Sequence, residues 1–147
     1  MTTNVKLMVV LSKFNYDFMT KLGKNLESLG MPGSTYLILA HLNIVKKEKT
    51  QKLGEVAAIS SGTITHVVNK MAHKGYVKKS KDSIDKRVFW VEITDKGREK
   101  FRKVDDEHMK YLNSILAVFS DEEKFEFIAQ VKNFGKKIKK NDSNNLQ

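Results

Sequence analysis

The chain contains no cysteine, a single proline and no long uninterrupted apolar segment. The absence of cysteine excludes disulfides, thiolate metal ligands, cysteine nucleophiles and thiol-based redox sensing. No stretch approaches the roughly 18 apolar residues of a membrane span. The N-terminal sequence MTTNVKLMVV also lacks the layout of a signal peptide. These absences predict a cytoplasmic protein with no membrane partner, and 40% hydrophobic content over 147 residues suffices for a folded core.

Arginine is scarce, although the chain is strongly basic. The net charge is +10, and only Arg87, Arg98 and Arg102 of the 27 basic residues are arginines. Because a lysine bias often reflects codon usage, the position of the charge is more informative than its sum. Between Lys46 and Arg87 there are 11 basic and four acidic residues, whereas from Asp95 onward there are 12 and 10. The excess therefore lies mid-chain and indicates an anionic partner, with an ordinary solvated lysine face as the alternative.

Residues 50–94 have the order of a winged helix-turn-helix: a short helix, a tight turn, an amphipathic helix and a basic hairpin. Thr50 is predicted to cap the first helix, and Ser60 or Ser61 the second. Gly75 is expected to end the second helix as a left-handed cap. The residues at helical spacing that should face the core are Leu53, Val56 and Ala57 in the first helix, Ile59 in the turn, and Ile64, Val67, Val68 and Met71 in the second helix.

The opposite face of the second helix is small and polar near its start and basic near its end. Short side chains let a helix approach base edges in the major groove, and hydroxyl groups bind bases or phosphates. Asn69 suits adenine, His66 suits a guanine acceptor, and Lys70 and Lys74 suit phosphates. For any one residue, the alternative is an ordinary solvent-exposed side chain. The predicted DNA-binding residues of this helix are Ser60, Ser61, Gly62, Thr63, Thr65, His66, Asn69, Lys70 and Lys74.

The basic hairpin is predicted to form a wing. Residues 76–80 and 87–93 have strand composition, and the polar linker 81–86 joins them. A planar guanidinium is favoured in a narrow minor groove, which makes Arg87 the expected contact there. Asp85 would repel phosphate, so its expected task is to orient Arg87 through a charge-assisted hydrogen bond. The predicted DNA-binding residues of the wing are Lys81, Asp85, Lys86 and Arg87.

Apolar residues also recur at helical spacing outside this region. An N-terminal stripe (Leu7, Leu11, Phe14, Phe18, Leu22) predicts a helix that ends near Gly30 to Gly33, and the apolar segment 34–45 predicts a buried helix. Thr94 is expected to cap a long helix. Ser120 and Glu123 form a capping box that opens a last helix. The stripes of these two helices comprise Phe101, Val104, Tyr111, Leu112, Ile115 and Leu116, and then Phe127, Ile128, Val131, Phe134 and Ile138.

Three long amphipathic helices present more apolar surface than so small a DNA-reading domain can cover. A second copy of the chain would cover it, so the sequence predicts a two-fold homodimer. Residues 1–33 and 95–147 are assigned to a helical dimerisation region, and residues 34–94 to the winged helix-turn-helix domain. An intramolecular helix bundle is the alternative. The expected fold class is mainly α, with a small β-hairpin wing.

Several motifs together resemble the MarR family of transcriptional regulators. They are L-x-E-x-A-x-I-S-x-x-T-I-T (Leu53–Thr65), K-G-Y-V (Lys74–Val77), D-K-R (Asp85–Arg87) and I-T-D-K-G (Ile93–Gly97), and the likeness covers nearly the whole chain. The resemblance implies a triangular homodimer with recognition helices in major grooves and wings in minor grooves. It implies repression at palindromic operators and, in many members, release by a small ligand. The chain departs from the family at Gly54, where alanine is more usual, and at Ala58, where glycine is common.

The sequence gives weaker evidence for a ligand-sensing site or a metal site. Phe14, Tyr36 and Tyr111 are candidates for an aromatic ligand cleft, with ordinary core packing as the alternative. A zinc-responsive regulator would draw on His41, Glu107 and His108, but adjacent helix residues diverge by about 100° and no His-x-x-x-His pair exists. We therefore assign no metal site and no cofactor.

No enzyme is expected, because the chain lacks a glycine-rich phosphate loop and a nucleophile elbow. Asp105, Asp106 and Glu107 are interpreted as a solvated face. The competing function is a winged-helix architectural or protein-interaction module without operator specificity.

Overall fold

The computed structural model describes residues 2–144, with side chains through residue 141. Residues 145–147, the end of the predicted dimerisation region, lie outside the described part. The chain forms two compact units, the first extending to Tyr111 and the second beginning at Leu112. Within the described part, no helix combines the length and the apolar character that crossing a membrane requires.

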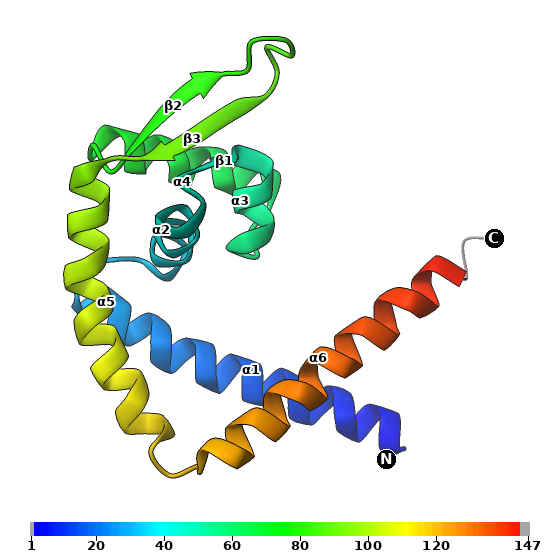
Figure 1. The fold of residues 1–147 in the computed structure, drawn as a ribbon. Helices are drawn as coiled ribbons and strands as arrows, with labels where there is room; N and C mark the ends of the chain where they lie inside the picture. Colours follow the sequence, from blue (N-terminus) through cyan, green and yellow to red (C-terminus); the bar gives the residue numbers. More distant parts are fainter. Residues whose placement is uncertain (1, 145–147) are drawn as a thin grey trace. The chain divides into compact units, whose positions relative to one another are not determined.

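The first unit contains five helices and a three-stranded antiparallel sheet of order β1-β3-β2. In Figure 1, β2 and β3 form a hairpin that projects beyond α4. The predicted fold class, mainly α with a hairpin wing, is confirmed. The elements are α1 (Thr3–Ser28), α2 (Gly33–Val45), β1 (Lys47–Lys49), α3 (Thr50–Val56), α4 (Ser61–His73), β2 (Val77–Lys81), β3 (Phe89–Ile93) and α5 (Asp95–Leu116), whose last turn belongs to the second unit.

Strand β1 was not predicted, because its three residues, Lys-Glu-Lys, carry no strand signal. It pairs antiparallel with β3 and places Glu48 opposite Val91. This pairing also changes the start of α3. The predicted cap at Thr50 is wrong, since Lys49 is the N-cap residue and no side chain caps the helix. The Thr50 hydroxyl instead donates to the Phe89 carbonyl oxygen at 3.1 Å, which ties α3 to the sheet.

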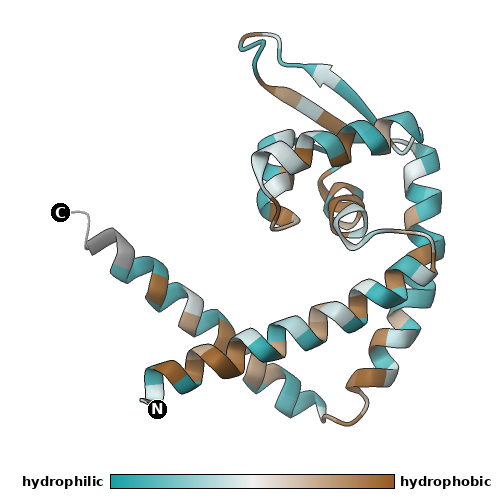
Figure 2. Ribbon diagram, turned by 180° about the vertical axis from the view of Figure 1, so that it is seen from behind, coloured by the Kyte–Doolittle hydropathy of each residue, from teal (hydrophilic) through white to brown (hydrophobic). Residues whose placement is uncertain are grey.

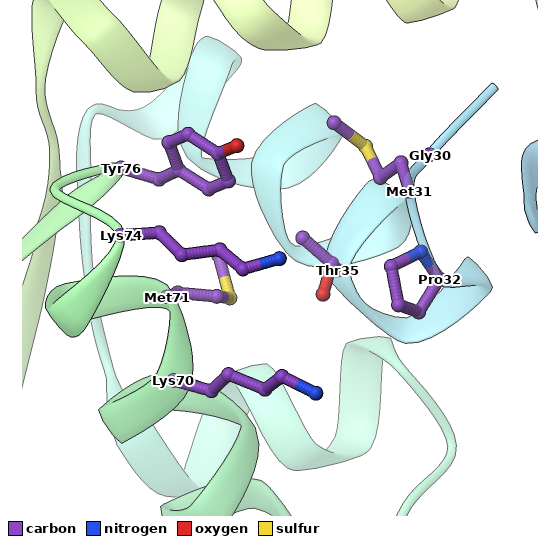
Figure 3. Close-up of a pocket in the computed structure, with 8 residues that line it drawn as sticks. All are labelled: Gly30, Met31, Pro32, Thr35, Lys70, Met71, Lys74 and Tyr76. Carbon is purple, nitrogen blue, oxygen red and sulfur yellow. The ribbon is translucent and has the colours of Figure 1, made fainter.

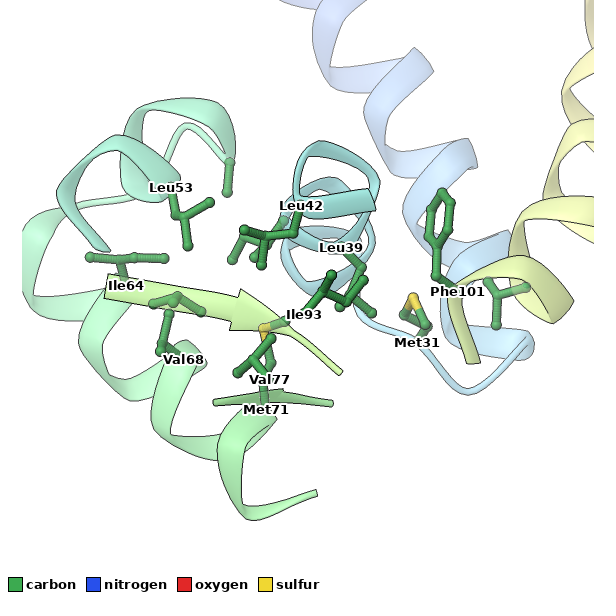
Figure 4. Packing of buried hydrophobic residues seen from close by; sticks show 14 of the residues in the cluster. Met31, Leu39, Leu42, Leu53, Ile64, Val68, Met71, Val77, Ile93 and Phe101 are labelled. Atoms are coloured by element: carbon green, nitrogen blue, oxygen red, sulfur yellow. The ribbon is translucent and has the colours of Figure 1, made fainter. Parts of the chain in front are cut away.

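One apolar core lies between α2, the helix-turn-helix and the sheet (Figure 4). Leu39 and Leu42 of α2 are fully buried within it, as the apolar segment 34–45 predicts. The predicted inner residues Leu53, Ile64, Val68 and Met71 are all buried, and Val67 is half-buried against them. The remaining core residues are Leu26, Met31, Ile38, Ala57, Val77, Val91, Ile93, Phe101 and Val104.

The end of α4 is joined to the start of α5 by a set of hydrogen bonds. Gly75 has φ of 75°, and the N–H groups of Gly75 and Tyr76 donate to carbonyls of the last turn of α4, which confirms the predicted left-handed cap. The Thr94 hydroxyl donates to the Gly75 carbonyl at 2.6 Å and accepts from the Gly97 N–H at 3.0 Å. Thr94 therefore caps α5 as predicted, and also binds the residue that ends α4.

A buried polar cluster links α1, α2 and α5. The Tyr36 hydroxyl donates to Asp105 Oδ1 at 2.6 Å, and the Tyr36 ring meets His108 edge-on at 5.0 Å. His108 is 2% exposed, and its Nδ1 lies 2.7 Å from Asn25 Oδ1. Burial lowers the pKa of His108, while burial and then Asp105 raise the pKa of Tyr36. The interpretation of Asp105 as part of a solvated face is wrong, because that carboxylate is half-buried and bonded to Tyr36.

The second unit contains the last turn of α5 and α6 (Asp121–Asn144). The predicted capping box is confirmed, since the Ser120 N–H donates to Glu123 Oε2 at 2.7 Å and the Glu123 N–H donates to Ser120 Oγ at 3.2 Å. The apolar stripe of α6 is exposed, and so is that of the N-terminal half of α1. Both are visible as brown residues in Figure 2. The exposed residues are Leu7, Met8, Leu11 and Phe14 in α1, and Phe127, Ile128, Val131, Phe134 and Ile138 in α6.

Candidate nucleic-acid interface

The predicted polar residues of α4 form one exposed face of that helix. Ser60 is the N-cap residue, and its Oγ accepts a hydrogen bond from the Thr63 N–H at 3.3 Å, as predicted. The Thr65 hydroxyl donates to the Ser61 carbonyl at 3.4 Å. These bonds fix the first turn of α4 and leave its small side chains facing solvent. The residues of the predicted set that are exposed are Ser60, Ser61, Gly62, Thr63, Thr65, His66, Asn69, Lys70 and Lys74.

The turn before α4 explains both departures from the family pattern. A Cβ at Gly54 would lie 3.3 Å from the Ile59 carbonyl oxygen, so glycine allows α3 to approach the turn closely. The Ile59 N–H donates to the Gly54 carbonyl at 2.9 Å across the same contact. Ala58 has φ of 53°, in the left-handed region that favours glycine. The turn thus keeps the backbone conformation suited to glycine, although alanine occupies it.

A lysine of the wing contacts the recognition face. The Lys79 ammonium donates to Asn69 Oδ1 at 2.6 Å and lies 5.1 Å from the centre of the Phe89 ring. This bond joins β2 to α4 and uses the amide oxygen that an adenine contact would need. Sequence reasoning did not select Lys79. Strand alternation places Lys79, Lys81 and Phe89 on one face of the hairpin, which is the signal that could have identified it.

The expected pair at the wing tip is present. Arg87 donates from Nε to Asp85 Oδ1 at 3.1 Å and from Nη2 to Oδ2 at 3.2 Å, while its backbone N–H also reaches Oδ1 at 3.0 Å. The hydrogen bonds from Arg87 lower the pKa of Asp85. The Arg87 side chain is otherwise 91% exposed. Asp85 thus holds the guanidinium in one orientation and leaves it accessible to a ligand.

Asp82 organises the rest of the wing tip and was missed by sequence reasoning. Its Oδ1 accepts from the N–H groups of Ile84 and Asp85 at 3.0 Å each, and its Oδ2 accepts from Trp90 Nε1 at 2.7 Å. These bonds, with the Trp90 bond contributing most, lower the pKa of Asp82 to about 2. An aspartate that opens a short polar linker between strands is typical of such a turn, and this could have identified it. Lys86 folds back onto the same turn and donates to the Ser83 carbonyl at 2.9 Å.

A groove lies between α4, the start of α3 and the wing. It encloses about 880 Å³ of space that is open in part to solvent. Its walls include the predicted contacts Ser61, Thr65 and Arg87, together with Lys49, Gln51 and Lys79, which the sequence did not select. Three cationic side chains therefore border one groove. Its chemistry suits a polyanionic backbone running between the helix and the wing.

The candidate sensing residues have other contacts. Tyr36 belongs to the buried cluster around Asp105, Phe14 stacks on Phe18 with ring centres 5.6 Å apart, and Tyr111 is half-buried at the end of the first unit. The three zinc candidates do not converge, because His41 pairs with Glu48, Glu107 pairs with Lys110, and His108 pairs with Asn25. Over the described residues, no cluster of three or more histidine or acidic side chains is arranged for a metal ion.

The family described as transcriptional regulator SarA/Rot matches residues 20–104, more than half of the chain and all of the helix-turn-helix and wing. The chain belongs to the SarA/Rot family. It is also similar to the HTH-type transcriptional regulator MhqR of Bacillus subtilis, at 26% identity over 120 residues that cover 82% of this chain and 83% of MhqR.

Solved structures share the fold. The chain resembles AbsC, a MarR family regulator from Streptomyces coelicolor, with a TM-score of 0.78, 18% identity and coverage of 95% and 97% of the two chains. It also resembles an organohalide-sensing regulator in a form bound to 2,4-dichlorophenol, with a TM-score of 0.75, 17% identity and coverage of 91% and 80%. The MarR resemblance is thus confirmed. This SarA/Rot protein is a DNA-binding transcriptional regulator with a MarR-type winged helix, and the compared proteins are regulators rather than enzymes.

Proposed function

We propose that this SarA/Rot protein is a homodimeric repressor that occupies a palindromic operator. In each subunit, the exposed face of α4 from Ser60 to Lys74 reads the major groove. The wing residues Lys81, Asp85, Lys86 and Arg87 reach the adjacent minor groove. The observation that carries the proposal is the pair formed by Asp85 and Arg87, which presents a fixed and exposed guanidinium beside a helix face of short polar side chains.

The groove between these two contacts supports a continuous DNA path. Lys49 and Lys79 border the groove that separates the helix face from Arg87. A DNA backbone crosses between its major and minor grooves at such a position, so the two lysines would meet phosphates there. In this arrangement, Lys79 holds Asn69 in the free protein and moves to a phosphate when the duplex binds. The Asn69 amide then becomes available for a base.

The exposed stripes of α1 and α6 support the homodimer. Phe127 and Phe134 of α6 are each 48% exposed in the single chain, and large aromatic side chains are seldom left in contact with water over so long a stripe. We assign dimerisation to residues 1–33 and 95–147, and DNA binding to residues 34–94. A two-fold dimer would present two recognition helices to two symmetric half-sites.

Selection of bound fragments from random duplex DNA tests the operator. We expect an enriched inverted repeat with half-site centres about one helical turn, roughly 10 base pairs, apart. Light scattering on the same preparation should give the mass of a dimer at micromolar concentration. Equal recovery of unrelated sequences would refute operator recognition and favour an architectural role. A monomer mass would refute the proposed interface.

Replacement of Arg87 tests the wing. We expect Arg87→Ala to weaken binding to the selected operator by about tenfold or more at moderate salt, as loss of a specific groove contact does. Asp85→Asn should produce a smaller loss, because the guanidinium stays but its orientation is no longer fixed. Arg102→Ala on α5 is the matched control, since it removes the same charge from an exposed side chain away from the wing. Equal affinity of the Arg87 and Arg102 variants would exclude the wing from recognition.

We extend the proposal to a small lipophilic effector that lowers DNA affinity. The support is the fold shared with the regulator bound to 2,4-dichlorophenol, together with the aromatic residues Phe14, Tyr36 and Tyr111. Fluorescence anisotropy of a labelled operator, followed during titration with 2,4-dichlorophenol, tests the extension. We expect saturable release of the operator, and Tyr36→Phe should shift the midpoint. An unchanged anisotropy would exclude a phenolic effector of this kind.

A further inference from the structure

A second pocket lies beside the C-terminal half of α4 (Figure 3). It forms where the segment between α1 and α2 approaches the C-terminal half of α4, and its narrow space is open in part to solvent. Met31 and Met71 form its apolar floor, and both are almost fully buried. Lys70 and Lys74 form one wall, and Pro32 and Thr35 form the other. The pocket therefore combines a rigid apolar base with a polar rim.

Two cations extend into this pocket without an anionic partner. In Figure 3 the ammonium groups of Lys70 and Lys74 extend from α4 toward Thr35 and Pro32. Neither lysine makes an ion pair with any residue in the part of the chain that the structure describes. Their spacing of four residues places both side chains on the same side of the helix. Two like charges converging on one pocket repel each other unless an anion lies between them.

Thr35 provides a hydroxyl group in the same place. Thr35 as a whole residue is 9% exposed, and Figure 3 shows its oxygen directed into the space between the two lysines. Among the described residues, this hydroxyl has no hydrogen-bond partner. No buried side-chain polar atom of the described residues lacks a hydrogen-bond partner, so the Thr35 oxygen itself keeps contact with solvent in the pocket. The Thr35 oxygen is therefore available to a ligand.

The start of α2 supplies a third favourable group. Pro32 is the N-cap residue of this 13-residue helix, and no side chain caps it. The N–H groups of the first turn have no intrahelical acceptors, and the helix dipole places partial positive charge at this end. Such a helix end favours an oxyanion. The pocket thus brings two cationic side chains and a hydroxyl group together beside the start of α2.

We propose that this pocket binds a phosphate group. Lys70 and Lys74 neutralise its charge, the Thr35 hydroxyl donates to one oxygen, and the first N–H groups of α2 donate to another. The phosphate has two possible sources, which are the backbone of bound DNA and a free phosphorylated small molecule. The DNA source rests on the function proposed above, whereas binding of free phosphate by the protein alone does not.

Titration of the free protein with inorganic phosphate tests the site. Backbone amide signals of Gly33, Ser34 and Thr35 are followed by NMR, with sodium chloride at matched ionic strength as the reference. We expect saturable shifts with phosphate and small linear shifts with chloride. Thr35→Val keeps the shape of the side chain and removes its hydroxyl, so it should lower the affinity for phosphate at least fivefold. Thr35→Ser, which retains a hydroxyl, should restore that affinity. Shifts equal to those with chloride, or equal affinity in Thr35→Val, would overturn the proposal.

Charge variants give a matched comparison. Lys74→Gln should lower the affinity for phosphate about tenfold. Lys78 is an exposed lysine of β2 outside the pocket, so Lys78→Gln should leave this affinity unchanged. An equal loss of phosphate affinity in both variants would show that only the net charge matters, and it would overturn the proposed site.

The duplex distinguishes the two sources once phosphate binding is established. If the occupant is a DNA phosphate, Thr35→Val weakens operator binding and inorganic phosphate competes with the operator for the pocket. If the occupant is a free phosphorylated molecule, Thr35→Val leaves operator affinity unchanged while its phosphate affinity falls. Either result supports the pocket. A protein that binds phosphate here but selects no operator would retain this site and lose the repressor function.

Discussion

The core around α2 and the helices α1 and α6 are built from similar apolar patterns, but only the first covers its apolar residues. Leu39 and Leu42 are fully buried, whereas Phe127 and Phe134 of α6 are each 48% exposed. Both sets recur at helical spacing, so the pattern alone does not tell whether a stripe is covered within the chain. The difference teaches that the core around α2 is covered within one chain, while the stripes of the flanking helices are exposed in the single chain.

The largest expected effect is at Gly97, inside the complete part. A Cβ there would overlap the Tyr76 carbonyl oxygen, which is backbone and cannot move aside. Gly97→Ala should therefore lower the free energy of unfolding by about 3 kcal/mol or more, measured by urea denaturation. Gly23→Ala is the matched control, because no atom lies within 4 Å of its added Cβ. Equal stability of the two variants would contradict the close packing of α5 on Tyr76.

A pair of truncations tests the comparison directly. Leu42→Ala should lower stability by about 2 to 5 kcal/mol at every protein concentration, because it opens a cavity in a closed core. Phe134→Ala should act mainly through association, so its effect should depend on protein concentration. Urea denaturation over a hundredfold range of concentration, with sedimentation analysis, measures both effects. A Phe134 variant that loses stability equally at all concentrations would place α6 in an intramolecular core.

The buried cluster of α1, α2 and α5 predicts a moderate dependence on pH. Burial lowers the pKa of His108, so the folded state prefers the neutral imidazole, bonded to Asn25. This contribution to stability is complete above the unfolded pKa of about 6.5. It is lost as pH falls from there toward the lower folded value. His108→Gln should flatten the decline in unfolding free energy just below pH 6.5, and an unchanged profile would exclude His108 as its source.

The smallest expected effect lies in the turn of the helix-turn-helix. Ala58 adopts φ of 53°, which costs an alanine about 1 kcal/mol relative to glycine. Ala58→Gly should therefore raise the free energy of unfolding by about 0.5 to 1 kcal/mol, offset in part by the entropy of the unfolded chain. Ala57→Gly, at a neighbouring alanine with φ of −85°, should destabilise instead. Thermal denaturation of both variants measures whether each one is stabilised or destabilised. Destabilisation of both variants would refute strain at Ala58.

Local sequence signals predicted the ends of several elements. Ser60, Gly75, Thr94 and the Ser120 capping box each act through the bond that their residue types favour. The predicted cap at Thr50 is wrong because its hydroxyl donates instead to the Phe89 carbonyl, which lies 39 residues away in sequence. A cap can be predicted from neighbours in sequence, but a competing partner brought close by folding cannot.

The candidate site shows the same limit. The pair of Asp85 and Arg87 could be predicted because its residues are two positions apart. The contact between Lys79 and Asn69, and the bond between Asp82 and Trp90, depend on how the hairpin lies on α4 and how it twists. Strand β1 was likewise determined by the free edge of β3 rather than by its own residues. The DNA-binding roles of Asn69, Asp85 and Arg87 stay predictions.

The Thr94 hydroxyl uses both of its hydrogen-bonding roles at one junction, one toward Gly75 and one toward Gly97. Because Gly97 has no side chain, the first turn of α5 also packs closely against the residues that follow α4. The end of α4 and the start of α5 are therefore held together at one tightly packed junction. A displacement of the first turn of α5 would therefore also displace the residues that end α4, at the start of the recognition helix's connection to the wing.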